Sequence, residues 1–273
     1  MTTLSQFIPT YEELFQRNIG ILSPEELEKL HASKVALAGV GGVGGVQLVT
    51  LARTGIGHFS IADPECFQAS DVNRQYGASI PTLGSKKVEV MEDIVSDINP
   101  EVCIETFPEG VTESCVNQFL KGADIVIDSV EYFALDMKIL LARKAREKTL
   151  YLLTSPTWGY GASMVVFSPE GMTFEEFFGV GTGEDFLTEG KRLANRVFPL
   201  KPDYLDPYPY GDDMLEGKKP ASVFCLGTLL SAALTTVEVL FILLGKQQPV
   251  TAPEVIQIDF FRRSFDIVDL VLE

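Results

Sequence analysis

The sequence is poor in the residues that build metal and disulfide sites, and it is short of positive charge. Its four cysteines are widely separated and no C-x-x-C pair occurs. That excludes a four-cysteine zinc site and a thioredoxin-like redox motif. Only 22 Lys and Arg stand against 38 Asp and Glu, which gives a formal net charge of −16. Such a field repels nucleic acid and anionic membranes, so we expect neither as a partner.

The scarcity of cysteine also bears on where the protein works. We find no secretory signal at the start of the sequence, and unpaired, scattered cysteines are typical of a reducing compartment. We therefore expect a reduced, cytoplasmic protein. With 273 residues and 46% hydrophobic content, the chain is long enough to bury one large core.

A glycine-rich segment between two apolar runs organises the rest of the chain. Residues 35–38 predict a buried strand, Gly39–Gly45 follows at once, and residues 46–54 have helical character. A second strand at 58–62 ends at Asp63. This order of strand, glycine turn, helix, strand and acid is typical of a nucleotide-binding fold. We predict an α/β fold: a Rossmann-like, doubly wound and mostly parallel sheet.

Each glycine of the motif has a separate physical reason. Gly39 allows the tight turn out of the strand, and Gly44 lets the helix pack against it. Gly41 lets the backbone approach a phosphate, which the free N–H groups and dipole of the helix start attract. Asp63 can accept hydrogen bonds from ribose hydroxyls. The alternative is a glycine turn that binds nothing, but such a turn needs no acid at the end of the next strand.

Three cations follow Asp63 in a chain that has few. Arg74 lies in a polar loop, and Lys86 and Lys87 precede a helix expected over 88–98. Arg offers a planar fork and Lys a point charge to phosphate oxygens. Beside a glycine-rich cradle, they indicate a triphosphate site. The alternative is that they are ordinary surface cations.

Two acids follow a later strand of the predicted sheet. Strands are expected at 102–107, 123–128 and 150–154, with helices at 113–121 and 136–147 between them. Because ligands bind at the carboxyl ends of parallel strands, Asp128 and Glu131 are candidates for magnesium and nucleotide contacts.

Six short motifs occur in a fixed order, and together they carry a resemblance. They are Arg17-Asn18-Ile19, Gly39–Gly44, Asp63-Pro64-Glu65, Ser70–Gln75, Gly84 with Lys87, and Ile98-Asn99-Pro100. In this order they resemble the ubiquitin-activating-enzyme-like (E1-like) superfamily, in its ThiF/MoeB/HesA branch. The resemblance covers roughly residues 14–155.

The resemblance implies an activity. Members bind ATP and Mg²⁺ and adenylate a carboxylate with release of pyrophosphate. In the ThiF- and MoeB-like members, the carboxylate is the C-terminal Gly-Gly of a small ubiquitin-like or sulfur-carrier protein. Members work as homodimers, so Arg17 would reach the phosphates of the neighbouring subunit. Paired C-x-x-C zinc motifs of some members are missing here.

The resemblance also implies roles for residues. Asp63 would hold the ribose, while Asn73, Arg74 and Lys87 would hold phosphates. The implied nucleotide-binding set is Gly39, Gly41, Gly42, Gly44, Asp63, Glu65, Asn73, Arg74, Lys87, Asp128 and Ser129. The implied catalytic set is Arg74, Lys87, Asp128 and Arg17, with Glu131 and Asp128 for the metal. Two positions depart from the pattern: Asp71 stands where the family has Asn, and Glu131 where it has the metal-binding Asp.

The last third of the chain is less typical of the family. We divide the chain into a lead-in at 1–33, a nucleotide-binding part at 34–155 and a substrate-facing part at 156–273, which form one unit. An irregular insertion is expected over 172–214, with Tyr204, Tyr208 and Tyr210 in a loop that contacts a partner or packs on the sheet. Strands are expected at 163–167, 254–260 and 262–272, as a small antiparallel part.

Residues 222–245 form the longest apolar stretch. Its length raises the alternative of a membrane span, but Glu238 and several Ser and Thr residues interrupt it. We expect a helix buried in the core and in a dimer interface. Cys225 begins this helix, and it is either a candidate acyl acceptor or a small buried hydrophobe.

Two other functions compete with activation of a carrier protein. Residues 51–57 are similar to the branch that dehydrates threonylcarbamoyladenosine in tRNA, also by ATP activation. The net charge opposes this reading. The other is a non-catalytic module that binds NAD or another adenine nucleotide, which the cations after Asp63 disfavour.

Overall fold

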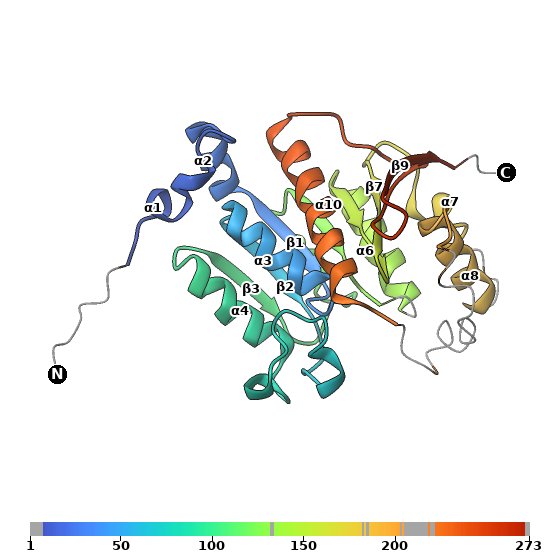
Figure 1. Cartoon of the computed structure of the whole chain (residues 1–273), viewed down its shortest axis with the longest axis horizontal. Coiled ribbons are helices and arrows are strands. Elements are labelled where there is room, and N and C mark those ends of the chain that lie inside the picture. The colour runs from blue at the N-terminus through green and yellow to red at the C-terminus, as the bar shows by residue number, and fades with distance from the viewer. Residues whose placement is uncertain are drawn as a thin grey trace.

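The computed structural model describes residues 8–131, 134–181, 183, 186–202, 204, 218 and 222–270. A nine-stranded sheet runs through it in the order β3-β2-β1-β4-β5-β7-β8-β9, with β6 paired to β7 (Figure 1). Strands β1 to β5 are parallel and the rest pair antiparallel, which confirms the predicted fold. The strands are β1 Lys34–Ala38, β2 His58–Ala62, β3 Cys103–Phe107, β4 Ile125–Asp128, β5 Tyr151–Thr154, β6 Thr157–Trp158, β7 Gly161–Phe167, β8 Glu254–Asp259 and β9 Ser264–Asp269.

Helices cover both faces of the sheet, and β1 shows why. Its side chains alternate between two buried clusters, Val35 and Leu37 in one and Ala36 and Ala38 in the other, because neighbouring side chains on a strand point to opposite faces. Helices α3, α4 and α10 pack into the first cluster, and α5 to α8 into the second. The helices are α1 Tyr11–Phe15, η1 Gln16–Asn18, α2 Pro24–Ala32, α3 Gly44–Thr54, η2 Ala69–Asp71, η3 Ile80–Thr82, α4 Lys87–Ile98, α5 Val116–Phe119, α6 Leu135–Glu147, α7 Phe174–Phe178, α8 Phe186–Val197 and α10 Cys225–Leu244.

The register of the sheet brings three strand ends together. Ala38 at the end of β1 pairs with Ala62 of β2 and with Asp128 of β4. Beyond the strands, Gly39 N donates to Ala62 O (2.7 Å) and Ser129 N donates to Ala38 O (2.8 Å). The turns that follow β1, β2 and β4 therefore meet at one edge, as parallel strands require.

The N-terminal helices are fixed at the opposite end of α3. Tyr11 Oη donates to Gly55 O (2.7 Å), and Asn18 Nδ2 donates to Thr54 O (3.2 Å). Because Gly44 begins α3 and Thr54 ends it, α1 and η1 lie at the helix end away from the glycine turn. Figure 1 shows α1 and α2 at one corner of the molecule.

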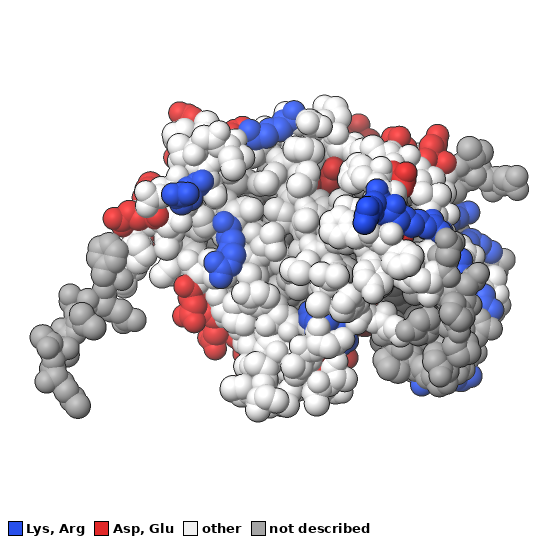
Figure 2. Space-filling view, in the orientation of Figure 1, with Lys and Arg blue, Asp and Glu red and all other residues white. Residues whose placement is uncertain are grey.

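The long apolar stretch forms helix α10. Within the described residues it is the one helix long and apolar enough to cross a membrane, and 56% of its most apolar window is buried. It packs against α3 and β7 and lies beside α3 in Figure 1. Its outer side leaves Leu226, Leu229 and Val237 exposed. Figure 2 shows that this face of the molecule is largely uncharged, with acidic groups towards its margins.

Two expected elements differ from those observed. Part of the segment 172–214, expected to be irregular, forms α7 and α8; Thr173 and Glu176 make a capping box that begins α7, and such a reciprocal cap stabilises a helix start. The helix expected at 113–121 is confined to Val116–Phe119. Tyr208 and Tyr210, and the end of the strand expected at 262–272, lie outside the described residues.

Candidate nucleotide site at the carboxyl edge of the sheet

Four of the five glycines in the segment 39–45 divide into two pairs. A Cβ added at Gly39 would lie 2.4 Å from the Ser129 carbonyl oxygen, and one at Gly44 would lie 1.8 Å from the Gly39 carbonyl oxygen. Gly39 also has φ +87°. Both therefore serve the close packing of turn, helix and strand. At Gly41 and Gly42 a Cβ would meet only side chains, the nearest being Gln75 at 3.6 Å and Arg74 at 3.2 Å.

Asp63 is held in place by two backbone amides. Its Oδ2 accepts from Val40 N and its Oδ1 from Glu65 N, each at 2.9 Å. The residue is 6% exposed, and burial raises its pKa, against the two amide hydrogen bonds and the charge of Lys87. The carboxylate is thus fixed at the end of β2 beside the glycine turn, where its remaining lone pairs can accept ribose hydroxyls.

Lys87 brings a buried ammonium group to the same turn. It is the first residue of α4 and is 3% exposed. Its Nζ lies 2.6 Å from Glu65 Oε2 and 3.7 Å from the Cβ position of Gly41. The backbone of Lys87 also donates to Glu65 O (3.0 Å). The predicted phosphate-binding cation therefore lies at the glycine that is predicted to approach the phosphate.

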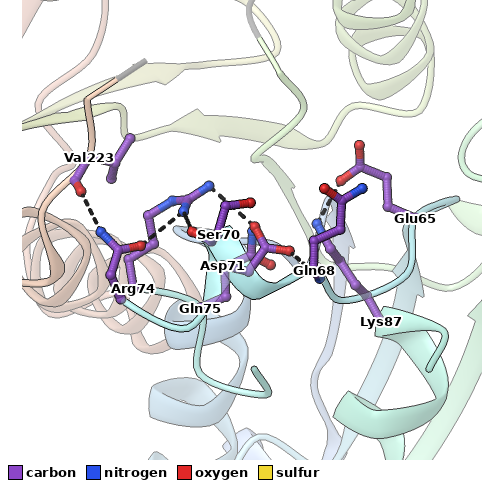
Figure 3. A network of polar contacts seen from close by, with 9 residues as sticks. Glu65, Gln68, Ser70, Asp71, Arg74, Gln75, Lys87 and Val223 are labelled. Carbon is purple, nitrogen blue, oxygen red and sulfur yellow. Dashed lines mark hydrogen bonds and ion pairs between the residues drawn. The ribbon is translucent and has the colours of Figure 1, made fainter. Parts of the chain in front are cut away.

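The loop around η2 is organised by Asp71, where the family pattern has Asn (Figure 3). Asp71 is 7% exposed. Its Oδ1 accepts from Gln75 Nε2 (2.6 Å) and Arg74 Nη2 (3.5 Å), and its Oδ2 from Gln68 N (2.9 Å). The Asp71 carboxylate thus accepts hydrogen bonds from three donors of its own loop. It is a buried acceptor that orients Arg74.

Arg74 and Asn73 link this loop to the start of α10. Arg74 Nη1 donates to Ser70 O (2.8 Å) and Asn73 Oδ1 (3.0 Å), and Asn73 Nδ2 donates to Val223 O (3.1 Å). Figure 3 shows Val223 beside the Arg74 loop. Cys225, two residues further on, begins α10 and is partly exposed.

Of the acids at and just after the end of β4, Asp128 has a partner that the sequence analysis did not predict. Asp128 is 2% exposed, and its oxygens accept from Lys138 Nζ at 3.0 and 3.1 Å. Val130 N also donates to Oδ1 (3.1 Å). Asp128, expected to contact magnesium and nucleotide, is thus bound to Lys138. Ser129, in the implied nucleotide set, donates its hydroxyl to Gln47 Oε1 (2.7 Å) and its backbone N–H to Ala38 O (2.8 Å), so both of its donors are used within the chain.

Sequence reasoning missed Lys138 and Gln47. Lys138 lies on the buried side of α6 with Leu135, Ile139 and Ala142, and a lysine on an apolar helix face is a signal for a buried partner. Gln47 is 0% exposed and lies one turn inside α3, a place where an apolar residue is the usual choice.

Glu131, the acid predicted to hold a magnesium ion, follows β4 and is exposed as a whole residue. Burial around its carboxyl group raises its pKa, and the nearby Glu65 raises it further, while Lys138, Lys87 and Arg74 oppose this. Mg²⁺ in nucleotide sites commonly takes one or two carboxylates, with phosphates and water completing its shell. Of the two carboxylates, Glu65 is already paired with Lys87, so Glu131 is the candidate for such a contact. The described residues contain no ready group of three or more His, Cys, Asp or Glu ligands.

Arg17 does not join the site within one chain. It is exposed and lies in η1, which is fixed at Thr54. Helix α3 has 11 residues, so about 16 Å of helix separates that end from Gly44. A role for Arg17 at the phosphates would require a second copy of the chain.

Comparison with known proteins gives matches over most of the chain. A family profile described as the ThiF family matches residues 15–271. A tRNA threonylcarbamoyladenosine dehydratase of Bacillus subtilis is 36% identical over 142 residues, 52% of this chain and 55% of that protein. A SAMP-activating enzyme of Haloferax volcanii is 26% identical over 173 residues, 62% of this chain and 63% of that protein. The matched region spans little more than half the length of these relatives.

Among solved structures, the fold resembles that of MccB from Escherichia coli, crystallised with ATP. The TM-score is 0.72 at 16% identity, over 96% of this chain and 73% of that one. At this identity the likeness concerns the fold alone.

Proposed function

We propose that this chain, which belongs to the ThiF family, binds ATP at the carboxyl edge of its sheet and transfers the adenylyl group to a carboxylate, with release of pyrophosphate. Asp63 would orient the ribose, and the turn at Gly41 and Gly42 would lie along the phosphates. Glu131 would hold the magnesium ion that neutralises phosphate charge.

One observation carries the proposal: two cations approach the open side of the glycine turn. Lys87 Nζ lies 3.7 Å from the Cβ position of Gly41, and Arg74 Nε lies 3.2 Å from that of Gly42. Both side chains are fixed, by Glu65 and by Asp71. Preorganised charges of this kind stabilise charge that develops during transfer. They also favour a triphosphate over NAD.

Our first candidate for the substrate is the C-terminal Gly-Gly of a small ubiquitin-like or sulfur-carrier protein. The SAMP-activating relative, which aligns over more of this chain than the tRNA relative does, supports this candidate. The net charge of −16 also favours a protein over a polyanion. Cys225 would then be a candidate acyl acceptor, because Asn73 draws the start of α10 to the Arg74 loop.

The second candidate is a tRNA carrying threonylcarbamoyladenosine. The identity to the Bacillus subtilis dehydratase, 36%, exceeds that to the SAMP-activating enzyme, 26%. Both substrates present a carboxylate, so the same nucleotide chemistry serves either one.

The test is exchange of labelled pyrophosphate into ATP, measured with a Gly-Gly carrier protein, with modified tRNA and with neither. We expect exchange with one substrate only. Arg74→Ala and Lys87→Ala should each slow it on the order of a hundredfold or more, and Lys121→Ala, a surface variant remote from the turn, should not. Cys225→Ser should leave exchange intact and abolish a hydroxylamine-sensitive adduct if Cys225 is the acceptor. Negligible exchange with every substrate would refute the proposal.

A further inference from the structure

A buried series of hydrogen bonds connects the end of β4 to α10 through one amide side chain. Gln47 on α3 is completely buried. Its Oε1 accepts from Ser129 Oγ (2.7 Å), and its Nε2 donates to Ser231 Oγ (3.1 Å) and Thr235 Oγ1 (2.8 Å). Both protons of the amide are used, on two residues one turn apart on the same face of α10.

The bonds that Ser231 makes fix which groups donate and which accept along this series of hydrogen bonds. Ser231 Oγ donates to Ser155 O (2.7 Å), and a hydroxyl has one proton to give. Ser231 must therefore accept from Gln47, so Gln47 Nε2 faces α10. Its Oε1 then faces Ser129, whose hydroxyl must donate. Ser155 continues the series by donating its own hydroxyl to Ser163 O (2.7 Å).

One end of the series lies at the glycine turn, and a separate hydrogen bond holds the segment before α10 to the Arg74 loop. At the glycine turn, the Ser129 carbonyl lies against Gly39, where it leaves no room for a Cβ. Independently of the series, Asn73, in the loop that holds Arg74, donates to Val223 O, two residues before α10 begins. Helix α10 thus has one attachment to the glycine turn, through Gln47, and the segment before it has one to the Arg74 loop.

We propose that Gln47 is a positioning residue that sets the register of α10 against the nucleotide cradle. A sliding or rotation of α10 would leave buried donors and acceptors without partners, and each such group is costly in a low-dielectric interior. The start of α10, with Val223 and Cys225, is thereby held in one place relative to Gly39, and nucleotide binding is transmitted to it. This inference depends on the proposed function only for the identity of the ligand, a nucleotide.

The first test needs no nucleotide. Gln47→Met keeps the length of the side chain and removes its amide, and amide hydrogen exchange reports local opening. Backbone amides of residues 229–232 should exchange roughly tenfold faster, while those of 241–244 change little, because loss of buried hydrogen bonds weakens only the first half of α10. Thr236→Val is the matched control. That hydroxyl is buried on α10 and has no hydrogen-bond partner among the described residues, so exchange should stay as in the wild type.

The second test adds Mg²⁺ and a non-hydrolysable ATP analogue. In the wild type, exchange should slow both in the loop at 70–76 and at 229–232. In Gln47→Met only the loop should respond. In pyrophosphate exchange, KM for ATP should change within about threefold while kcat falls roughly tenfold, since the cradle survives and the α10 start is misplaced.

The possible outcomes distinguish failure of this inference from failure of the proposed function. Equal acceleration at both ends of α10 without nucleotide would show a merely structural role and overturn the inference. So would a normal response of 229–232 to the analogue in Gln47→Met. If the wild type shows no response in either region, ATP binding is refuted, and the nucleotide-free comparison still decides the role of Gln47.

Discussion

At the scale of single residues, Asp71 shows how one carboxylate can serve neighbouring donors. It accepts from Gln75, Arg74 and the backbone of Gln68. An Asn at this position has one acceptor oxygen and a donor amide group. Gln75 can turn its amide over to accept, but Arg74 and the Gln68 amide only donate, so one of them would face the amide group of the Asn.

We therefore expect Asp71→Asn, the residue of the family pattern, to be harmful here. The loss should be about 1–3 kcal/mol of unfolding free energy, the usual cost of a buried donor without an acceptor. Adenylyl transfer should fall as well, because Arg74 loses its carboxylate partner and keeps only Ser70 O and Asn73 Oδ1. Urea unfolding and pyrophosphate exchange measure the two effects, with the exposed Asp97→Asn on α4 as control. A variant as stable and active as the wild type would contradict this role.

Because of Glu238 on α10, we expect an unusual pH dependence of the free energy of unfolding. It is 5% exposed, its Oε2 has no hydrogen-bond partner among the described residues, and burial raises its pKa against the amide of Val250. A raised pKa in the folded state means that its contribution to stability is present at low pH and is lost as the pH rises through that pKa.

Glu238→Gln should accordingly be more stable than the wild type at pH 8, by about 1–2 kcal/mol, because the amide has no charge to desolvate. The difference should shrink as the pH falls through the pKa of Glu238. Urea unfolding at several pH values measures it, and the exposed Glu28→Gln on α2 is the control. An advantage that does not vary with pH would argue against a charged, desolvated Glu238.

At the scale of elements, we expect different glycines of the turn to serve folding and nucleotide binding. Gly44→Ala would drive a Cβ into the Gly39 carbonyl, so we expect an insoluble or strongly destabilised protein, with a loss above about 3 kcal/mol. Gly41→Ala meets only ordinary contacts and should fold, but its methyl group would stand in the phosphate path. Thermal unfolding with and without Mg-ATP measures both. Stabilisation of Gly41→Ala by ATP equal to that of the wild type would count against this geometry.

The elements that could be predicted from sequence are those defined by near neighbours. The glycine turn, Asp63 and the strands around them follow from spacings within thirty residues. Gln47 could not be predicted, because its partners lie 82, 184 and 188 residues away along the chain. Lys138 was missed because its partner Asp128, at the carboxyl end of a predicted parallel strand, was assigned to magnesium and nucleotide instead. Helices α7 and α8 were missed because the abundance of Phe and Gly concealed a capping box.

At the scale of the whole molecule, the exposed apolar side of α10 predicts a second copy of the chain. Leu229 on α10 is 55% exposed, and Arg17 lies too far from the glycine turn of its own chain to reach it. We expect a homodimer by light scattering. Leu229→Glu should shift it towards monomer and reduce adenylyl transfer. Ile267→Glu on the edge strand β9, where the side chain is 51% exposed, is the matched control and should remain dimeric.

Mixing two inactive variants distinguishes a shared site from mere association. In a heterodimer of Arg17→Ala and Arg74→Ala chains, one of the two sites would hold both arginines. Random mixing should therefore restore about a quarter of the wild-type activity. If the mixture stays as inactive as its components, Arg17 does not act across the dimer.

The ion pair of Lys87 with Glu65 has a consequence for how tightly any nucleotide is held. The Lys87 ammonium already has a carboxylate partner at 2.6 Å, and Glu65 itself is 60% exposed. A phosphate reaching Lys87 replaces one counter-ion with another, and the displaced carboxylate returns to water. Such a swap recovers less free energy than the neutralisation of an unpaired buried charge would. We therefore expect Glu65 to act as an internal competitor that lowers nucleotide affinity and, in the proposed reaction, speeds the release of pyrophosphate.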